Sequence, residues 1–398
     1  MQGDCRAVLP RLAAGSVHCV VTSPPYYGLR DYGVAGQMGL EASLDDYLAE
    51  MVGVFREVRR VLRADGTCWV NMGDSYNANQ GSGFNGNAGK PTASARMNTG
   101  LAPKQLLMVP ARLALALQAD GWWLRSDIIW SKPNPMPESV TDRPTSAHEH
   151  VYLLTKSARY YWDAEVVRED AEYGVSIDRE NASCGPFRSI AGGGFRGGAR
   201  AHSYGGTRNM RNVWELATEA FGEAHFATFP TALAERCIRA GTSERGCCGG
   251  CGAPHVRTTD VSYTDAHRGM VGNQRKTITD ALVMHAGREQ DKRMDKHVAT
   301  LGWSASCGCG AATVPCLVLD PFGGAGTTGL VADRLRRDAV LIELSPAYCE
   351  MARRRIAADG PLFNQLELFA GDAAPVPDDA ADARMADLFA SRVEAAAD

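Results

Sequence analysis

The stretch that decides the fold is Cys316–Gly329, with the sequence CLVLDPFGGAGTTG. Its first four residues are an apolar run of strand formers, which predicts a short buried strand. The residues from 320 to 326 then predict a glycine-rich turn, and those from 327 to 335 predict a helix that begins at a threonine. A strand, a glycine turn and a helix N-terminus together bring backbone N–H groups close to a ligand.

The glycines of this turn match the spacing of a dinucleotide-binding fingerprint, with Gly324, Gly326 and Gly329 in the three positions. Such a site needs an acidic residue at the end of the next strand to hold ribose hydroxyls. Glu343 fills that position, after the strand-like run 339–342. The pattern leaves both NAD and S-adenosylmethionine open as ligands. A pyrophosphate would need its charge balanced, and the turn carries an acid without any lysine or arginine.

A second loop follows the strand-like run 17–21 and has the sequence Thr-Ser-Pro-Pro-Tyr at residues 22–26. Two consecutive prolines make this loop stiff, and ligands of open α/β sheets bind at the carboxyl ends of strands. The Ser23 hydroxyl and the Pro24 carbonyl can accept hydrogens from an amine, and Tyr26 offers a ring for stacking. If this amine belongs to adenine or cytosine, it is a poor nucleophile. Catalysis of a reaction at that nitrogen would then come mostly from alignment and charge placement.

The two loops resemble those of the DNA amino-methyltransferases, which transfer a methyl group from S-adenosylmethionine to N6 of adenine or N4 of cytosine. The order along the chain resembles the permuted β class of that family, and the resemblance covers most of residues 1–356. It implies a catalytic loop made of Ser23, Pro24, Pro25 and Tyr26. It implies a cofactor site made of Asp4, Asp320, Pro321, Phe322, Gly323, Gly324, Gly326, Thr327, Thr328 and Glu343. The segments 130–133 and 148–150 resemble those that line the catalytic cleft.

The sequence predicts the methylated base less clearly than it predicts the methyl-transfer reaction. Many adenine enzymes of the family have Asp or Asn where this chain has Ser23, and serine was first associated with cytosine N4. The Tyr26–Tyr27 pair is found with adenine methylation too. We favour N6 of adenine in duplex DNA, reached by base flipping, with N4 of cytosine as the alternative.

The composition fits one large α/β domain with insertions, because the chain has 398 residues and 45% hydrophobic content. The expected core is a mostly parallel, doubly wound sheet with helices on both faces, which is a Rossmann-like methyltransferase fold. No run of 18 apolar residues predicts a membrane span, and the N-terminus lacks the pattern of a secretory signal. Twelve scattered cysteines do not suggest a disulfide framework, so we expect a cytoplasmic protein.

The net charge of −4 is concentrated in an Ala- and Pro-rich tail. Residues 371–398 carry seven acids and two arginines, so the rest of the chain has a net charge of +1. We expect part of this tail to be disordered. A glycine-rich segment, 186–212, carries arginines without acids and is a candidate DNA-binding surface. Its arginines are Arg188, Arg196, Arg200, Arg208 and Arg211.

Four cysteines have the spacing of a metal site. Cys248 and Cys251 form a C-x2-C pair, and Cys307 and Cys309 form a C-x-C pair further along. Four thiolates from two tight turns would bind structural Zn²⁺, whereas the alternative is a set of reduced, unliganded thiols.

These features predict five segments. They are a catalytic half (1–156), a target-recognition insertion (157–212), a linking helix with a cysteine-bearing insertion (213–315), a cofactor half (316–356) and a C-terminal segment (357–398). Relatives of the β class are often dimers, so we expect a homodimer; a restriction partner stays open. The alternatives are a NAD-binding oxidoreductase and a catalytically inactive nucleic-acid-binding module.

Overall fold

The computed structural model describes residues 1–29, 31, 33–77, 99–173, 204–219, 229–265 and 294–360. The chain divides into a larger unit, Met1–Asp163 with Arg211–Val256 and Trp303–Asp398, and a smaller unit, Ala164–Met210 with Arg257–Gly302. The acidic tail at 371–398 lies outside the described residues.

The larger unit contains a seven-stranded sheet with the order β13-β12-β1-β2-β4-β3-β7. The strands are β1 (Val17–Thr22), β2 (Leu62–Met72), β3 (Trp123–Ser131), β4 (His148–Thr155), β7 (Val213–Glu215), β12 (Leu317–Asp320) and β13 (Asp338–Leu341). All neighbouring strands are parallel except that β4 runs antiparallel to β2 and to β3. The prediction of a mostly parallel sheet is therefore confirmed.

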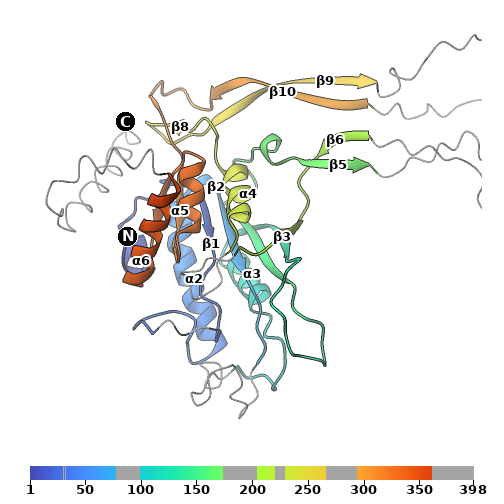
Figure 1. Cartoon of the computed structure of the whole chain (residues 1–398). Helices are drawn as coiled ribbons and strands as arrows, with labels where there is room; N and C mark the ends of the chain where they lie inside the picture. Colours follow the sequence, from blue (N-terminus) through green and yellow to red (C-terminus); the bar gives the residue numbers. More distant parts are fainter. Residues whose placement is uncertain are drawn as a thin grey trace, which may run out of the picture. The chain divides into compact units, whose positions relative to one another are not determined.

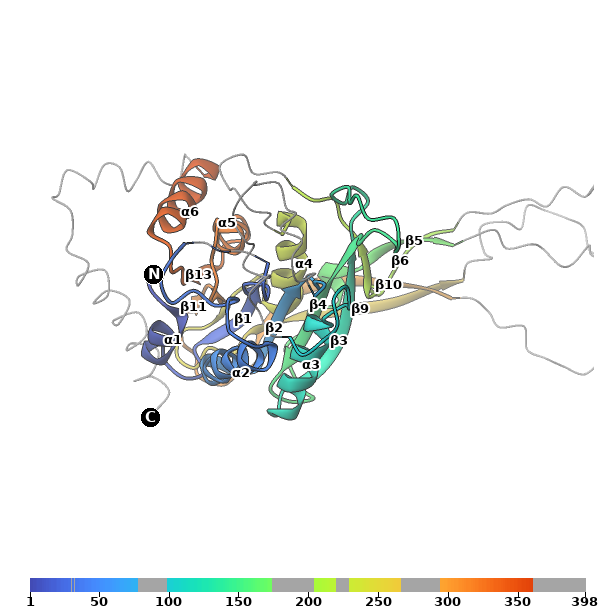
Figure 2. The same ribbon diagram turned by 90° about the horizontal axis from the view of Figure 1, so that it is seen from below.

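Helices cover both faces of this sheet (Figures 1 and 2). One face carries α1 (Cys5–Val8), α2 (Leu44–Val61) and α3 (Val109–Ala119), with the 3-10 turn η1 (Leu9–Arg11) after α1. The other face carries α4 (Thr231–Gly241), α5 (Thr327–Arg334) and α6 (Pro346–Asp359). The sheet is doubly wound, as the sequence predicts.

The central strands are apolar because they are buried on both sides. All six residues of β1 are buried, as are all four of β12. Strands with both faces covered have continuous apolar runs rather than alternation. Helix α2 packs on them through a stripe that includes Tyr47, Met51 and Phe55, which recur at helical spacing. The Ser43 side chain caps its first turn by accepting a hydrogen bond from the Asp46 N–H.

The smaller unit contains β5 (Glu169–Tyr173) and β6 (Tyr204–Arg208), which pair antiparallel, and the 3-10 turn η3 (Glu165–Val167). It also holds most of the pair formed by β9 (His255–Asp265) and β10 (Met294–Ala305). A short antiparallel pair in the larger unit joins β8 (Cys247–Cys248) to β11 (Thr313–Val314). The smaller unit thus draws on residues from both predicted insertions. The role of the 157–212 insertion in target recognition stays a prediction.

Among the helices in the described part of the chain, none combines the length and the apolar character needed to cross a bilayer.

Two helical glycines offer a test of this packing. A Cβ atom added at Gly241 of α4 would lie 2.2 Å from the buried Thr67 hydroxyl of β2, whereas one added at the exposed Gly53 of α2 would meet nothing within 4 Å. We expect Gly241→Ala to lower the free energy of unfolding by about 1–3 kcal/mol through overpacking. Gly53→Ala should raise it by roughly 0.5–1 kcal/mol, since alanine is the better helix former. Urea denaturation of both variants checks this, and equal effects would contradict the packing of α4 on β2.

Candidate active site

The candidate site lies at one edge of the sheet, where the carboxyl ends of the parallel strands meet. Strand β1 lies between β12 and β2, so the loop that follows Thr22 lies beside the loop that follows Asp320. Because β4 is antiparallel, its first residues also lie at this edge, paired with the last residues of β2 and β3. The topology therefore brings together both loops on which the sequence analysis depends.

A buried carboxylate joins the two loops directly. Asp320 is 1% exposed and accepts hydrogen bonds from the hydroxyls of Thr22 (2.7 Å) and Thr328 (2.8 Å). It also accepts from the backbone N–H of Phe322 at 3.1 Å. Burial raises the pKa of Asp320 to about 6, although these donors act in the opposite direction. Asp320 therefore contacts protein groups and fixes the end of β1 to the cofactor loop.

The glycines of the cofactor loop allow close packing. Gly326 has a φ of +78° and precedes the first residue of α5. A Cβ atom at Gly326 would lie 2.8 Å from the Ala352 Cβ of α6, and one at Gly329 would lie 2.7 Å from Leu341. Gly324, with a φ of +50°, would meet only the Phe322 carbonyl, at 3.9 Å. The loop therefore packs tightly against α6 and β13 and leaves space beside Gly324.

Among the other residues predicted to bind the cofactor, Thr327 and Thr328 are buried, and Pro321 and Gly323 are buried as well. The Thr327 hydroxyl accepts a hydrogen bond from Arg355 at 2.9 Å. Phe322, by contrast, is only partly buried, packed against the core.

Glu343 follows β13 and closes the loop from the other side. Its carboxylate accepts from the backbone N–H of Gly324 and from that of Ser345, each at 2.8 Å. Its own backbone bonds to the N-terminal segment, since the Gly3 N–H donates to the Glu343 carbonyl at 2.9 Å. Residues 1–3 are thereby held beside the cofactor loop.

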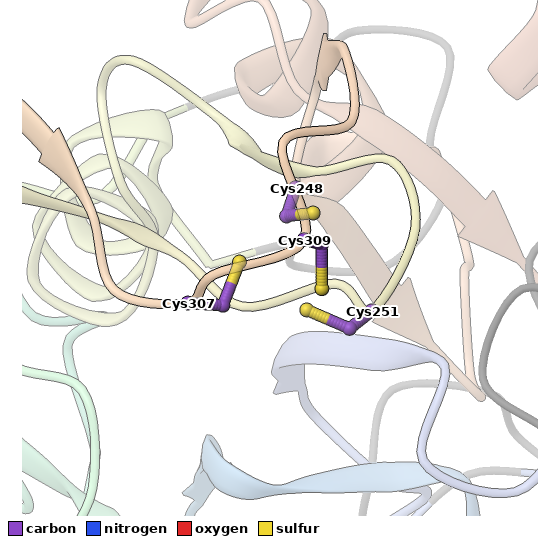
Figure 3. A group of neighbouring side chains, drawn as sticks. All are labelled: Cys248, Cys251, Cys307 and Cys309. Carbon is purple, nitrogen blue, oxygen red and sulfur yellow. The ribbon is translucent and has the colours of Figure 1, made fainter. Parts of the chain in front are cut away.

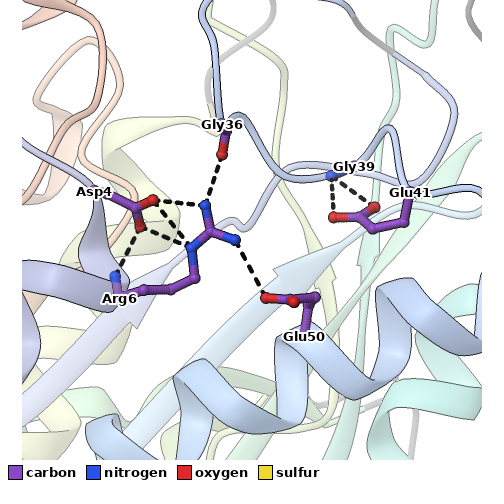
Figure 4. Close-up of polar contacts among 6 residues, drawn as sticks. All are labelled: Asp4, Arg6, Gly36, Gly39, Glu41 and Glu50. Carbon is purple, nitrogen blue, oxygen red and sulfur yellow. Dashed lines mark hydrogen bonds and ion pairs between the residues drawn. The ribbon is translucent and has the colours of Figure 1, made fainter.

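Asp4 follows this segment and caps α1 (Figure 4). Its carboxylate accepts from the Arg6 backbone N–H at 2.8 Å and forms an ion pair with the Arg6 guanidinium at 2.6 Å. Arg6 also donates to the Gly36 carbonyl and to Glu50. The Arg6 side chain holds the pKa of Asp4 below its usual range. Contact of Asp4 with the cofactor stays a prediction.

The catalytic loop is fixed by the protein on both sides. Pro24 is buried, and the Pro25 carbonyl accepts a hydrogen bond from the Tyr47 hydroxyl of α2 at 2.8 Å. The Tyr26 ring lies against Gly73, where an added Cβ would approach it to 2.9 Å. This is the stiff loop that the two prolines predict.

The Tyr26 hydroxyl is the centre of a hydrogen-bond network. It donates to the Glu149 carboxylate at 2.7 Å and accepts from the Ser23 hydroxyl at 3.2 Å. The Asn71 amide donates both to the Tyr26 oxygen (3.1 Å) and to Glu149 (2.8 Å), and Lys132 pairs with Glu149 at 2.5 Å. Burial, followed by the Glu149 charge, raises the pKa of Tyr26 well above its ordinary value. The phenol therefore stays protonated and keeps donating to Glu149.

The sequence indicates two segments of this hydrogen-bond network but not the role of any residue in them. The segments that carry Lys132 and Glu149 resemble cleft-lining segments, but their pairing with Tyr26 had no local signal. Asn71 was missed altogether, because only the position of the β2 end beside the catalytic loop shows its proximity. Thr22 and Arg355 were also missed, because their partners Asp320 and Thr327 lie on other elements of the fold.

The predicted DNA-binding arginines are only partly described. Arg188, Arg196 and Arg200 lie outside the described residues. In the smaller unit, Arg208 forms an ion pair with Glu169 of the neighbouring strand at 3.3 Å. In the larger unit, the Arg211 carbonyl accepts a hydrogen bond from the Trp214 indole at 2.8 Å. DNA contact by these arginines stays a prediction.

The four predicted metal ligands do come together. The sulfur atoms of Cys248, Cys251, Cys307 and Cys309 all lie within 4.8 Å of one another. Their turns lie near the start of β1 and β2, since His18 of β1 contacts the Gly252 carbonyl and Arg63 of β2 donates to the Cys251 carbonyl. The cysteine cluster is therefore at the opposite end of these strands from the candidate active site.

Comparisons with known proteins identify a family and several relatives of this chain. A family model described as DNA methylase matches residues 17–249 and 316–354. The chain is 38% identical over 363 residues to the type II methyltransferase M.Cfr9I of Citrobacter freundii, covering 90% of this chain and 87% of that protein. It is 37% identical over 360 residues to the type II methyltransferase M.XycI of Xanthomonas campestris pv. cyanopsidis, covering 89% and 86%. It is 34% identical over 365 residues to the type II methyltransferase M.SmaI of Serratia marcescens, covering 89% of each.

The pKa of Asp320 gives a test of the contact between the loops. Because its folded-state pKa of about 6 lies above the ordinary value of 3.8, ionisation of this group disfavours folding. Its contribution should therefore lower stability by about 3 kcal/mol as the pH rises from roughly 4 to 6. Asp320→Asn should remove this loss. An amide can still accept from Thr22 and the Phe322 N–H and can donate to the Thr328 oxygen, whose own hydroxyl then donates to the Val21 carbonyl.

The measurement is the free energy of unfolding of both proteins between pH 4 and 7. We expect Asp320→Asn to gain stability relative to the wild type across this range. Asp320→Ala, which leaves the buried Thr22 hydroxyl without an acceptor, should instead lose about 1–3 kcal/mol. Parallel pH profiles for the wild type and Asp320→Asn would show that the carboxyl group is not the buried acceptor.

Proposed function

The chain belongs to the DNA methylase family of N6 and N4 methyltransferases, and from this premise we propose that it transfers a methyl group from S-adenosylmethionine to an exocyclic amine of one base in duplex DNA. The observation that carries the proposal is the Asp320 contact with Thr22, which holds the Ser23–Tyr26 loop beside the glycine loop. A methyl donor in one loop and an amine in the other would then meet at a single edge of the sheet.

The residues of the glycine loop fit an adenosine-containing cofactor. Glu343 presents a half-buried carboxylate suited to ribose hydroxyls, and the space beside Gly324 lets a ligand approach the backbone. S-adenosylmethionine, when bound, supplies a methyl group activated by a sulfonium. Glu343, Gly324 and Phe322 are the residues that would hold it. Asp320, Thr327 and Thr328 would not contact the cofactor but would hold the glycine loop in position. The resemblance instead implies that these three residues are part of the cofactor site.

Hydrogen bonding prepares Ser23 to accept. The Ser23 hydroxyl donates its hydrogen to Tyr26, and Tyr26 donates its own to Glu149. The lone pairs of the Ser23 oxygen then point away from that hydrogen. The Asn71 amide lies 3.5 Å from this oxygen, and an incoming amine would donate to the remaining lone pair. The Pro24 carbonyl would be the second acceptor. Two acceptors for the two amine hydrogens align the nitrogen lone pair with the methyl group.

Lys132 and Asn71 fix the direction of the hydrogen bonds in this network. The Lys132 ammonium balances the Glu149 charge, and the Asn71 amide donates to both Glu149 and Tyr26. Glu149 is therefore held as an acceptor, which fixes the direction of the hydrogen bonds from Ser23 onward. The amine proton released after transfer would pass to solvent or to a neighbouring acceptor.

For the target base, N6 of adenine is the candidate that the sequence analysis favours, with the extruded base stacked on the Tyr26 ring. N4 of cytosine is the second candidate, and Ser23 in place of Asp or Asn is the observation that favours it. Both amines present the same two hydrogens to Ser23 and Pro24, so the mechanism is common to them.

The macromolecular partners follow from the proposed DNA methylation. Duplex DNA would bind through the arginines of 186–212, and extrusion of the base would be offset by these contacts. A homodimer stays a prediction, and a restriction partner stays open. The relatives named type II methyltransferases make a sequence-specific target the natural expectation.

The direct experiment is methyl transfer from labelled S-adenosylmethionine to unmethylated genomic DNA, followed by mass spectrometry of the nucleosides. N6-methyladenine supports the first candidate, and N4-methylcytosine supports the second. The absence of any methylated nucleoside, in a protein shown to bind the cofactor, would refute the proposed activity and favour an inactive nucleic-acid-binding module.

Variants at Tyr26 test the role of the network. Tyr26→Phe keeps the ring but removes the acceptor for the Ser23 hydrogen, so we expect kcat to fall about tenfold, for a loss of about 1.4 kcal/mol. Tyr26→Ala also removes stacking, which is worth about 1–3 kcal/mol, and kcat should fall about 5–150-fold further. Single-turnover methylation kinetics measure both. S-adenosylhomocysteine affinity should stay unchanged, and Tyr160→Phe, outside the network, serves as the control. Full activity in Tyr26→Phe would exclude the proposed direction of the Ser23 hydroxyl.

A further inference from the structure

Two tight turns that are far apart in sequence face each other in the larger unit, each with a pair of cysteines (Figure 3). One turn precedes β9 and carries Cys248 and Cys251, and the other follows β10 and carries Cys307 and Cys309. We propose that these four thiolates bind one structural Zn²⁺ ion, which fixes the two ends of the β9–β10 segment to each other.

The sulfur positions match what zinc requires. All four sulfur atoms lie within 4.8 Å of one another. A tetrahedral site with Zn–S bonds of about 2.3 Å separates its sulfurs by about 3.8 Å. Side-chain rotations that move each sulfur by less than about 1 Å would therefore complete the site. Cys251, Cys307 and Cys309 are not buried, so a metal ion can reach them.

The backbone of the first turn holds its cysteines in place independently of any metal. The Gly252 N–H donates to the Cys248 carbonyl at 2.7 Å, and Gly252 has a φ of +69°. The Gly249 N–H donates to the Ala312 carbonyl at 2.8 Å, and Cys248 pairs with Thr313 across β8 and β11. The first turn is thereby fixed to the strand that follows the second turn, as a preformed site needs.

Side chains of the central sheet also hold the first turn in place. His18 accepts a hydrogen bond from the Leu317 N–H at its Nδ1 (3.0 Å), so its Nε2 carries the proton and donates to the Gly252 carbonyl (2.8 Å). Arg63 donates to the Cys251 carbonyl at 2.8 Å. These contacts are outer supports of the kind that orient metal ligands.

A second group of potential ligands, His18 with Cys247 and Cys316, does not offer a comparable site. Both ring nitrogens of His18 are already used by backbone groups, as described above. All three residues are buried in the core. Of these two groups, the four-cysteine cluster is therefore the one suited to a metal ion.

The position of the cluster indicates a structural role. It lies at the opposite end of β1 and β2 from Ser23 and Asn71, so it has no part in methyl transfer. Three of its four cysteines fall in residues 250–315, which the DNA methylase family model does not match. Zinc would replace a hydrophobic core for this small insertion, because metal binding contributes directly to the folding free energy of such segments.

The test is the metal content of the full-length protein, purified without chelators or added metal and measured by inductively coupled plasma mass spectrometry. We expect one zinc per chain, and Cys307→Ser/Cys309→Ser should lose at least four-fifths of it. Cys349→Ser, outside the cluster, is the matched control and should keep one zinc. Replacement by cobalt(II) should give the absorption bands of a tetrahedral tetrathiolate site.

Because the double variant could fail to fold, the wild type provides a second measurement. Removal of the metal with a thiol-modifying reagent should release one zinc and increase hydrogen exchange in residues 246–256 and 303–314, while β1 and β12 stay protected. A wild-type protein without bound metal, with freely titrating thiols or with disulfides among the four cysteines, would overturn the proposal. Iron in place of zinc would also overturn it.

Discussion

The arrangement of this protein depends on one buried carboxylate. Asp320 connects Thr22, which is 298 residues away in the chain, with Thr328 at the start of α5. Burying a carboxyl group is unfavourable, and three donors offset part of that cost here. The same bonds set the separation between the residue before the catalytic loop and the first residue of the cofactor loop. A sliding of β12 along β1 would break them, so the two halves of the site have a single relative position.

This constraint explains why such different parts of the chain can form one site. Strand β1 is the first strand along the chain and β12 is one of the last, yet they are neighbours in the sheet. The entropy of closing a long loop grows only slowly with its length, so the long insertions between them add little to the cost of that pairing. The insertions are free to vary as long as the strands that carry Ser23 and Asp320 keep their register. One end of these strands carries the chemistry, whereas the cysteine cluster lies at the other.

The fold and both loops could be predicted from the sequence because their signals are local. The apolar runs, the two prolines and the glycine turn act within a few residues of their own positions. The partners of each side chain could not be predicted, since they depend on register between strands. Asp320, for example, accepts hydrogen bonds from Thr22 of another strand and from Thr328 of a helix. Glu149 reaches Tyr26 only because β4 starts where β2 ends.

On the proposed mechanism, the same network explains how a serine can stand where a carboxylate is common. A carboxylate at that position would accept an amine hydrogen strongly but would bring an unpaired charge into the pocket. Here the negative charge is kept on Glu149, where Lys132 balances it, and only its directing effect reaches Ser23 through the Tyr26 hydroxyl. The network thus orients the acceptor at the reacting amine and does not place a charge beside it. Since direction depends on the two amine hydrogens and not on the ring that carries them, this hydrogen bonding by itself does not choose between adenine and cytosine.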